Sequence, residues 1–286
     1  IIYDISNPSA IATTSAVDLG FTGTSVFVSG RYAYVSVGDG TIKIFDVSNP
    51  QRIIQMGSIS FVSTPNNLYI FGRYLYAVTG SAFGDNEFQI IDISDPRSPV
   101  EVGGAELNAG VRGVYVSGPY AYVVGDNVLG NDFVIYDISN PLSIATTSVT
   151  TLGNIGNKVF VSGRYAYIVN NGVTGNDFRV YDVSNPASPV LVGGADLGGG
   201  GRAVTVSGKR VYVGTITVSG NEFKVFELNG LETTSAIVHS LEAGNLQVRN
   251  DIITQGQLQV GGGVNIGSGG IFSAGPLSVS IASSTQ

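Results

Sequence analysis

The chain has 286 residues, of which 43% are hydrophobic and only 12% are charged, and it contains no Cys. Its net charge of −7 excludes the basic surface that nucleic-acid binding requires, and the lack of Cys excludes disulfides and thiolate metal sites. No apolar run approaches the roughly 20 residues of a membrane helix, so we expect no direct membrane insertion by this segment.

The first predicted element, "YDISNPSAIATTSAVDLG" at residues 3–20, returns almost unchanged as "YDISNPLSIATTSVTTLG" at residues 136–153. Versions of its opening motif occur throughout the chain, with aspartates separated by 42, 46, 45 and 45 residues. One further step of 45 residues reaches Glu227 in a diverged copy, "FELNG". The aspartates of the motif are Asp4, Asp46, Asp92, Asp137 and Asp182. A period of this length indicates a repeat architecture.

A second motif, of the type "FVSGRYAYV", follows the same spacing. Its glycines are separated by 42, 46, 45 and 45 residues, and they are Gly30, Gly72, Gly118, Gly163 and Gly208. Because two independent motifs keep one register, we interpret the chain as a series of duplicated units.

Each unit contains four short strands, which we term a to d. In the fourth unit they are predicted at residues 157–163, 164–170, 176–183 and 188–197, from β-branched and aromatic runs broken by Gly, Asn and Pro. Proline falls in the c–d turns and at the start of some d strands, which predicts that strand d is the outer edge strand. Four-stranded units of 40 to 50 residues are typical of a β-propeller.

We therefore predict an all-β fold for residues 1–230, a β-propeller of about six four-stranded antiparallel blades. The first blade is incomplete, because residues 1–20 supply only its strands c and d. The repeated aspartate has a structural explanation, since its carboxylate can accept backbone N–H groups of the c–d turn. A ligand role is the alternative interpretation.

The pair of motifs "VSGRYAYV" and "IYDVSNPASPVLVGG" resembles the LVIVD-repeat family of bacterial β-propellers. The similarity extends over about residues 1–228, with departures such as Phe71 in place of Ser and Pro119 in place of Arg. The resemblance implies a surface or secreted protein, usually without a defined enzymatic activity. We accordingly expect a bacterial extracellular or cell-surface location, and we expect the chain to be part of a longer protein.

Residues 231–286 have a different character, forming a junction and then a nearly chargeless segment rich in Gly and Ser. Apolar pairs recur there, for example Leu246 with Val248 and Leu258 with Val260. One interpretation is a flexible linker. The other is a short β-rich stalk, which resembles stalk segments of phage tail fibres and trimeric adhesins. For the stalk we expect a homo-oligomer, a trimer, joined through this tail.

Few residues point to catalysis. A single histidine, His239, and no Cys make a catalytic triad or a histidine metal site hard to build. Acids are present in the predicted loops, and they are Asp39, Asp85, Glu87, Asp126, Asp132 and Asp177. However, "GNDF" or "GNEF" recurs at matching positions, residues 130–133, 175–178 and 220–223, and this repetition favours a hairpin role. We expect no cofactor and no metal, with an isolated loop calcium as the open alternative.

The strongest candidate for a binding site is the mouth of the propeller. Six residues before each glycine of strand a lies a polar residue, and these are Thr24, Asn66, Arg112, Asn157 and Arg202. Their identities vary between repeats, as expected of blade-specific functions, and the two arginines can bind a carboxylate bidentately. Solvated loops are the alternative. The sequence thus favours a non-enzymatic adhesion module that binds a glycan or a surface protein. A glycan hydrolase or lyase, or a purely structural fibre segment, stays open.

Overall fold

The computed structural model describes residues 1–80, 86–107, 109–128, 131–172, 175–216 and 222–227. The chain divides into two compact units, residues 1–231 and residues 232–286. The stalk or linker prediction and His239 lie outside the described residues.

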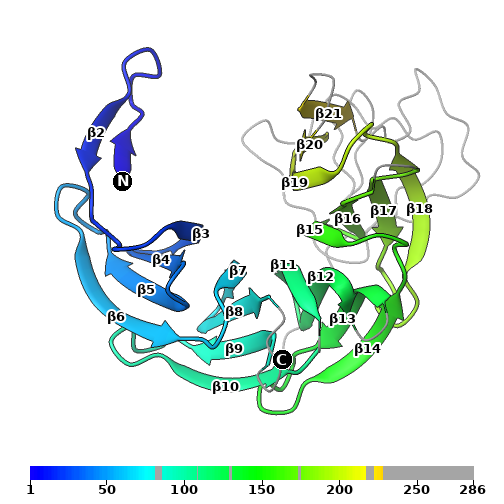
Figure 1. Cartoon of the computed structure of the whole chain (residues 1–286), viewed down its shortest axis with the longest axis horizontal. Helices are drawn as coiled ribbons and strands as arrows, with labels where there is room; N and C mark the ends of the chain where they lie inside the picture. Colours follow the sequence, from blue (N-terminus) through cyan, green and yellow to red (C-terminus); the bar gives the residue numbers. More distant parts are fainter. Residues whose placement is uncertain (81–85, 108, 129–130, 173–174, 217–221, 228–286) are drawn as a thin grey trace, which may run out of the picture. The chain divides into compact units, whose positions relative to one another are not determined.

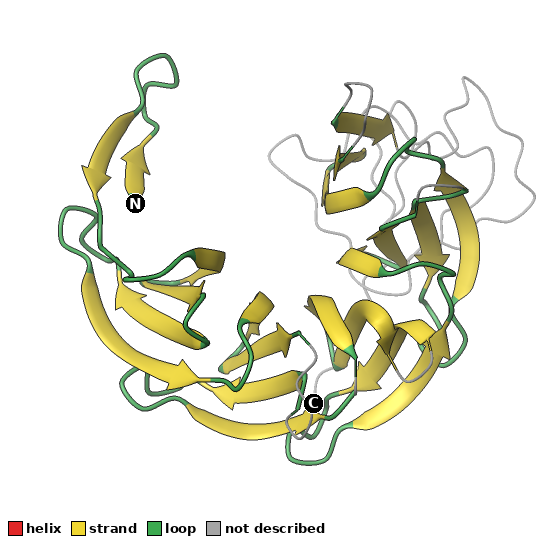
Figure 2. Cartoon of the chain, viewed as in Figure 1, coloured by secondary structure: helices red, strands yellow, loops and turns green. Residues whose placement is uncertain are grey.

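All regular structure in the described ranges is β-strand, and it forms six sheets (Figures 1 and 2). The first is a hairpin of β1 (Ile2–Asp4) and β2 (Ala12–Ser15). The second contains β3 (Gly23–Ser29), β4 (Tyr32–Val37), β5 (Thr41–Asp46) and β6 (Ile54–Ser60). The third contains β7 (Pro65–Phe71), β8 (Tyr74–Thr79), β9 (Phe88–Asp92) and β10 (Val100–Ala105).

The remaining sheets repeat the same order. The fourth contains β11 (Gly110–Ser117), β12 (Tyr120–Val128), β13 (Asn131–Asp137) and β14 (Ala145–Thr150). The fifth contains β15 (Gly156–Ser162), β16 (Tyr165–Asn170), β17 (Phe178–Asp182) and β18 (Val190–Ala195). The sixth contains β19 (Gly201–Ser207), β20 (Arg210–Thr215) and β21 (Phe223–Glu227).

The predicted class, strand order and incomplete first blade are confirmed. Neighbouring strands pair antiparallel, and the d strands β6, β10, β14 and β18 are edge strands, as the proline positions predicted. The a–b turn is tight because Ser162 pairs with Tyr165, leaving Gly163 and Arg164 between the strands. Gly163 has φ of 58°, a left-handed conformation that glycine adopts without steric cost.

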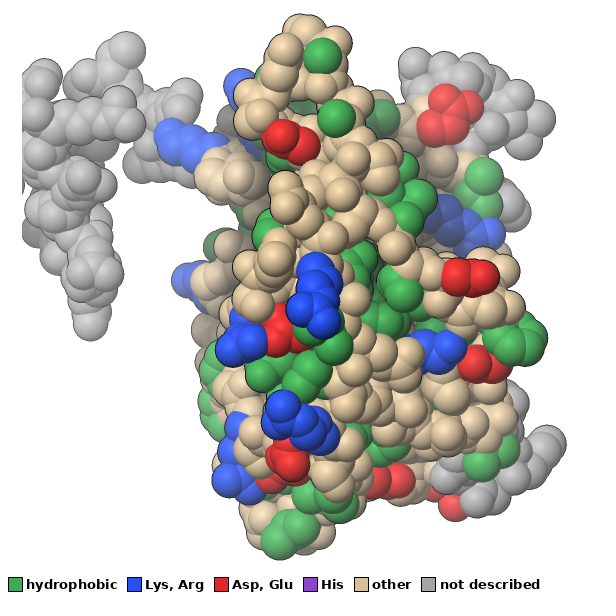
Figure 3. Space-filling model, turned by 90° about the vertical axis from the view of Figure 1, so that its left-hand side faces the viewer, with side chains coloured by type: hydrophobic (Ala, Val, Ile, Leu, Met, Phe, Trp, Pro, Cys, Tyr) green, Lys and Arg blue, Asp and Glu red, His purple; other side chains and the backbone are tan. Residues whose placement is uncertain are grey.

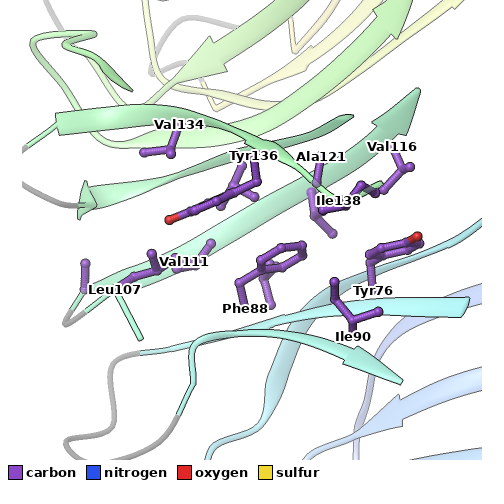
Figure 4. Packing of buried hydrophobic residues seen from close by; sticks show 14 residues of the cluster. Tyr76, Phe88, Ile90, Leu107, Val111, Val116, Ala121, Val134, Tyr136 and Ile138 are labelled. Atoms are coloured by element: carbon purple, nitrogen blue, oxygen red, sulfur yellow. The ribbon is translucent and has the colours of Figure 1, made fainter. Parts of the chain in front are cut away.

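The core lies between consecutive sheets, not inside any one of them. Strand a of each sheet contacts strand a of the next, through the pairs β3–β7, β7–β11, β11–β15 and β15–β19. Figure 4 shows the core between the third and fourth sheets, where Phe88 lies between Tyr76 and Tyr136. The ring centroid of Phe88 is 6.3 Å from that of Tyr76 and 5.6 Å from that of Tyr136, and both pairs are stacked.

The second sheet exposes apolar side chains on the face that would pack against a complete first sheet. Val159 and Val161 of β15 are each 5% exposed, because they pack on β12 and β13 of the preceding sheet. The matching residues of β3, Val26 and Val28, are 64% and 59% exposed. They line an apolar cavity with Ile2 of the first hairpin, which supplies only two strands.

The repeated aspartates tie two turns of their own sheet together. Asp182 accepts the backbone N–H of Ser184 at 3.0 Å, and its second carboxylate oxygen accepts Nε of Arg164, also at 3.0 Å. The Arg164 guanidinium lies 5.4 Å from the ring centroid of Tyr165, a cation–π contact. The same arrangement recurs twice, as Arg31 with Asp46 and Arg73 with Asp92. Figure 3 shows basic side chains (blue) in contact with acidic side chains (red) at several points on one side of the molecule.

The fourth sheet provides a natural control for this arrangement, because Pro119 replaces the arginine there. Asp137 still accepts the N–H of Ser139 at 2.9 Å. The Arg164 guanidinium, followed by the bonds from Ser184, lowers the pKa of the Asp182 carboxyl. The bonds from Ser139 alone lower the pKa of Asp137.

We expect Asp182→Asn to destabilise the protein at pH 7 more than Asp137→Asn does, because only the first change removes an ion pair. A carboxyl whose pKa is lowered by folding stabilises the native state fully above its unfolded pKa of about 3.9, and this contribution is lost progressively as the pH falls from there through the lower pKa of the folded state. The difference from wild type should therefore shrink from pH 5 to pH 2. Urea midpoints across this range test it. Equal losses of stability in both variants at pH 7, or a difference between Asp182→Asn and wild type that grows as the pH falls, would show that the arginine contributes nothing.

Candidate functional site

The five residues predicted to form the mouth occupy one structural position, the extra residue of a β-bulge near the start of strand a. In β15, Gly156 pairs with Asn170 and Lys158 pairs with Val169, so Asn157 between them has no partner of its own. The same shift in register leaves out Thr24 of β3, Asn66 of β7, Arg112 of β11 and Arg202 of β19. A bulge changes the direction of the side chain that it carries, and bulges are frequent beside functional sites.

Three of these side chains donate a hydrogen bond to a backbone carbonyl of the next sheet. The Thr24 hydroxyl donates to the Pro65 carbonyl at 2.9 Å, and the Asn66 amide donates to the Val111 carbonyl at 2.7 Å. Asn157, which is 5% exposed, donates to the Gly201 carbonyl at 2.7 Å. Each acceptor belongs to strand a of the following sheet. These residues therefore have a scaffolding role in addition to any contact with a ligand.

The two arginines are more available. Arg112 is half-buried and donates a long bond of 3.4 Å to Oδ1 of Asn157. Arg202 is exposed and makes no side-chain hydrogen bond to a described residue. Four of the five predicted residues, all except Thr24, line one cavity of about 420 Å³ together with Gly80, Gly110 and Lys158. Cavities of a few hundred Å³ are of the size that holds small molecules.

Lys158 is the member of the site that sequence reasoning missed. It immediately follows the bulge residue Asn157, and burial lowers the pKa of its ammonium group to about 8. A signal for the bulge does exist in the sequence: a glycine inside a strand pattern stands just before Thr24, Asn157 and Arg202. Nothing in the sequence shows that the side chain after the bulge is partly buried in the same cavity.

Two of the predicted loop acids, Glu87 and Asp132, stabilise the scaffold. Glu87 is 1% exposed and accepts the N–H of Leu107 at 2.6 Å. Asp132, at the same place one repeat later, accepts the N–H groups of Leu152 at 2.9 Å and of Gly153 at 3.1 Å. Each carboxylate thus fixes the loop that follows strand d of its own sheet. Asp177, one repeat further, is 1% exposed, and burial raises the pKa of its carboxyl.

Two negative findings concern the described ranges alone. No three or more His, Cys, Asp or Glu side chains gather there in a group that could hold a metal ion. No helix in those ranges is long and apolar enough to cross a membrane. Asp85 and part of the loop after Asp126 lie outside the described residues, so the loop-calcium alternative stays a prediction.

Solved structures similar to this one have related folds at low sequence identity. A computationally designed protein, Ika8, matches with a TM-score of 0.55 and 15% identity, over 72% of this chain and 58% of that one. This chain thus spans less than two thirds of the designed protein. A functionally unknown protein from Desulfotomaculum acetoxidans DSM 771 matches with a TM-score of 0.57 and 17% identity, over 75% of this chain and 68% of that one.

A third similar structure is the periplasmic gluconolactonase PpgL of Pseudomonas aeruginosa, with a TM-score of 0.54 and 16% identity, over 69% of this chain and 65% of that one. At such identities these likenesses show the fold alone. No curated protein sequence matches the chain. The family model of the LVIVD repeat matches residues 22–60, 65–105, 110–151 and 155–196, which together make up more than half of the sequence. The chain therefore belongs to the LVIVD-repeat family.

Proposed function

We propose that this protein is a non-enzymatic interaction module of the bacterial cell surface or extracellular space, and that it binds a glycan at the cavity beside the bulge residues. The observation that carries the proposal is the contrast between repeats. The turn motifs are nearly identical from sheet to sheet, whereas the five bulge positions hold Thr, Asn, Arg, Asn and Arg. A purely structural role would favour the same residue at every bulge. Different residues at equivalent bulges are better explained by contacts with one asymmetric ligand.

The chemistry of the cavity supports binding over hydrolysis. Glycoside hydrolysis commonly uses two carboxyl groups on either side of the scissile bond. The described residues that line the cavity are Asn, Gly, Arg and Lys, with no carboxylate among them. Glu87 and Asp132 are already held by backbone N–H groups. The gluconolactonase shares the fold at 16% identity, which keeps an enzymatic function as the second candidate.

The proposed tail-mediated trimer would fit this function. Several propellers on one stalk act on the same ligand-bearing surface, so weak affinities at single sites add up through avidity. A surface protein as ligand, in place of a glycan, is an outcome that the experiment below separates.

The test is binding of the fluorescently labelled full chain to an array of bacterial and host glycans. We expect a restricted set of glycans to bind, and Arg202→Ala to weaken that binding at least about tenfold, since hydrogen bonds to charged groups contribute about 1.5–3 kcal/mol. Arg52→Ala removes the same charge at an exposed c–d turn and should leave binding unchanged. If both variants bind glycans as strongly as the wild type, the binding site does not lie at this cavity. An array without signal would favour a protein ligand or the structural alternative.

A further inference from the structure

Three cations from three consecutive sheets line the cavity. Arg112 comes from β11, Lys158 from β15 and Arg202 from β19. The chain as a whole carries a net charge of −7, so this concentration of positive charge runs against its composition. Among the described residues no carboxylate lines the cavity, and none of the three side chains forms an ion pair with a described acid.

The neighbouring charges explain why Lys158 is uncompensated. The other charged groups that line the cavity, Arg112 and Arg202, are cations like Lys158 itself. Burial lowers the pKa of Lys158, and no acid in the described ranges counteracts this effect. A partly buried ammonium group without a counter-charge is costly for a folded protein. An anion in the cavity would remove that cost and would gain charge-assisted hydrogen bonds.

We propose that the cavity is an oxyanion site, in which Arg112, Lys158 and Arg202 together hold a carboxylate or sulfate group carried by an acidic saccharide. The two guanidinium groups offer planar donor pairs that match either oxyanion, and the ammonium group offers a third point of attachment. Asn66 and Asn157 keep the sheets in place around this clamp, because their amides bond to the following sheet. This inference rests on the proposed function and specifies its ligand class.

Calorimetric titration of the full chain at low ionic strength tests the proposal with three probes. Tetragalacturonate presents carboxylates, its methyl ester presents the same rings without charge, and sodium sulfate presents the oxyanion alone. We expect tetragalacturonate or sulfate to bind, and the methyl ester to bind at least about tenfold more weakly than the acid. The carboxylate and sulfate arms distinguish the two sources of the oxyanion. Absence of binding by both would overturn the proposal.

Variants locate the site, with melting curves to confirm that each one folds. Arg202→Ala and Lys158→Gln should each weaken anion binding about tenfold or more, the effect expected for loss of one charge-assisted hydrogen bond. Arg52→Ala is the charge-matched control and should bind as the wild type does. Equal weakening in the control would mean that the net charge of the protein, not the cavity, attracts the anion.

The pH dependence identifies the role of Lys158. Because its pKa is about 8, the free site loses a positive charge as the pH rises from 7 to 9.5, while arginine stays charged. Anion affinity should fall about tenfold over this range in the wild type and stay constant in Lys158→Gln. A wild-type affinity that does not change with pH would contradict the proposed role of Lys158 in binding the oxyanion. If neutral glycans bind the array and lose binding in Arg202→Ala, the proposed function holds and the oxyanion inference fails.

Discussion

Replacing Phe88 by Ala is expected to destabilise the protein by about 3–5 kcal/mol, the usual cost of removing a buried phenyl ring from a core. Phe88 is 0% exposed and lies between the third and fourth sheets, stacked against Tyr76 and Tyr136 (Figure 4). The change leaves a cavity between two sheets, because the strands on either side are fixed by their ladders of hydrogen bonds.

The repeat supplies a matched control in Phe223, which occupies the same position in the sixth sheet and is 67% exposed. Phe223→Ala should therefore cost less than about 1 kcal/mol, since surface substitutions have small effects. Urea unfolding of both variants measures the two free energies. If the two variants lose similar stability, then Phe223 is covered by part of the chain or by another copy, and the account of that face is wrong.

Gly103→Ala should be the second severe change. Gly103 lies in the edge strand β10, where an added methyl group would overlap the carbonyl oxygen of Pro141 in the c–d turn of the next sheet. The backbone of that turn cannot rotate away as a side chain could, so the sheets would have to move apart. Overpacking of this kind costs about 1–3 kcal/mol.

Its control is Gly193, at the same position of β18, where an added methyl group meets no atom within 4 Å. Gly193→Ala should be neutral or slightly stabilising, since alanine restricts the unfolded chain more than glycine does. Thermal melting of the pair gives the comparison. Loss of stability in Gly193→Ala equal to that in Gly103→Ala would indicate a strand effect of alanine, with no role for contact between sheets.

The local elements of this fold could be predicted because their causes are local. The turn at Gly163 follows from a glycine flanked by strand-forming residues, and the c–d turns follow from Asp and Pro at a fixed distance. The tyrosine and valine runs specify strands through their side-chain alternation. Repetition of the two motifs in one register then gave the number and order of the sheets.

The contacts between sheets could not be predicted in the same way, since they join residues about 45 positions apart. The sequence predicts Asn66 and Asn157 as candidate ligand-binding residues, and the structure shows that each also bonds to the following sheet. Their side chains have that reach only because a bulge redirects them. A bulge changes the pairing by one residue and leaves the composition of the strand unchanged. For the same reason, the sequence did not place Lys158 beside the two arginines.

We propose that the cavity beside the bulge residues binds a glycan without transforming it. Proton NMR of the full chain mixed with its best array ligand, followed over a day, tests both parts in one sample. We expect saturation transfer from protein to ligand, its loss in Arg202→Ala, and ligand resonances that stay unchanged in number and position. New resonances from cleaved or ring-opened sugar, growing in proportion to protein concentration, would contradict the account and establish an enzyme.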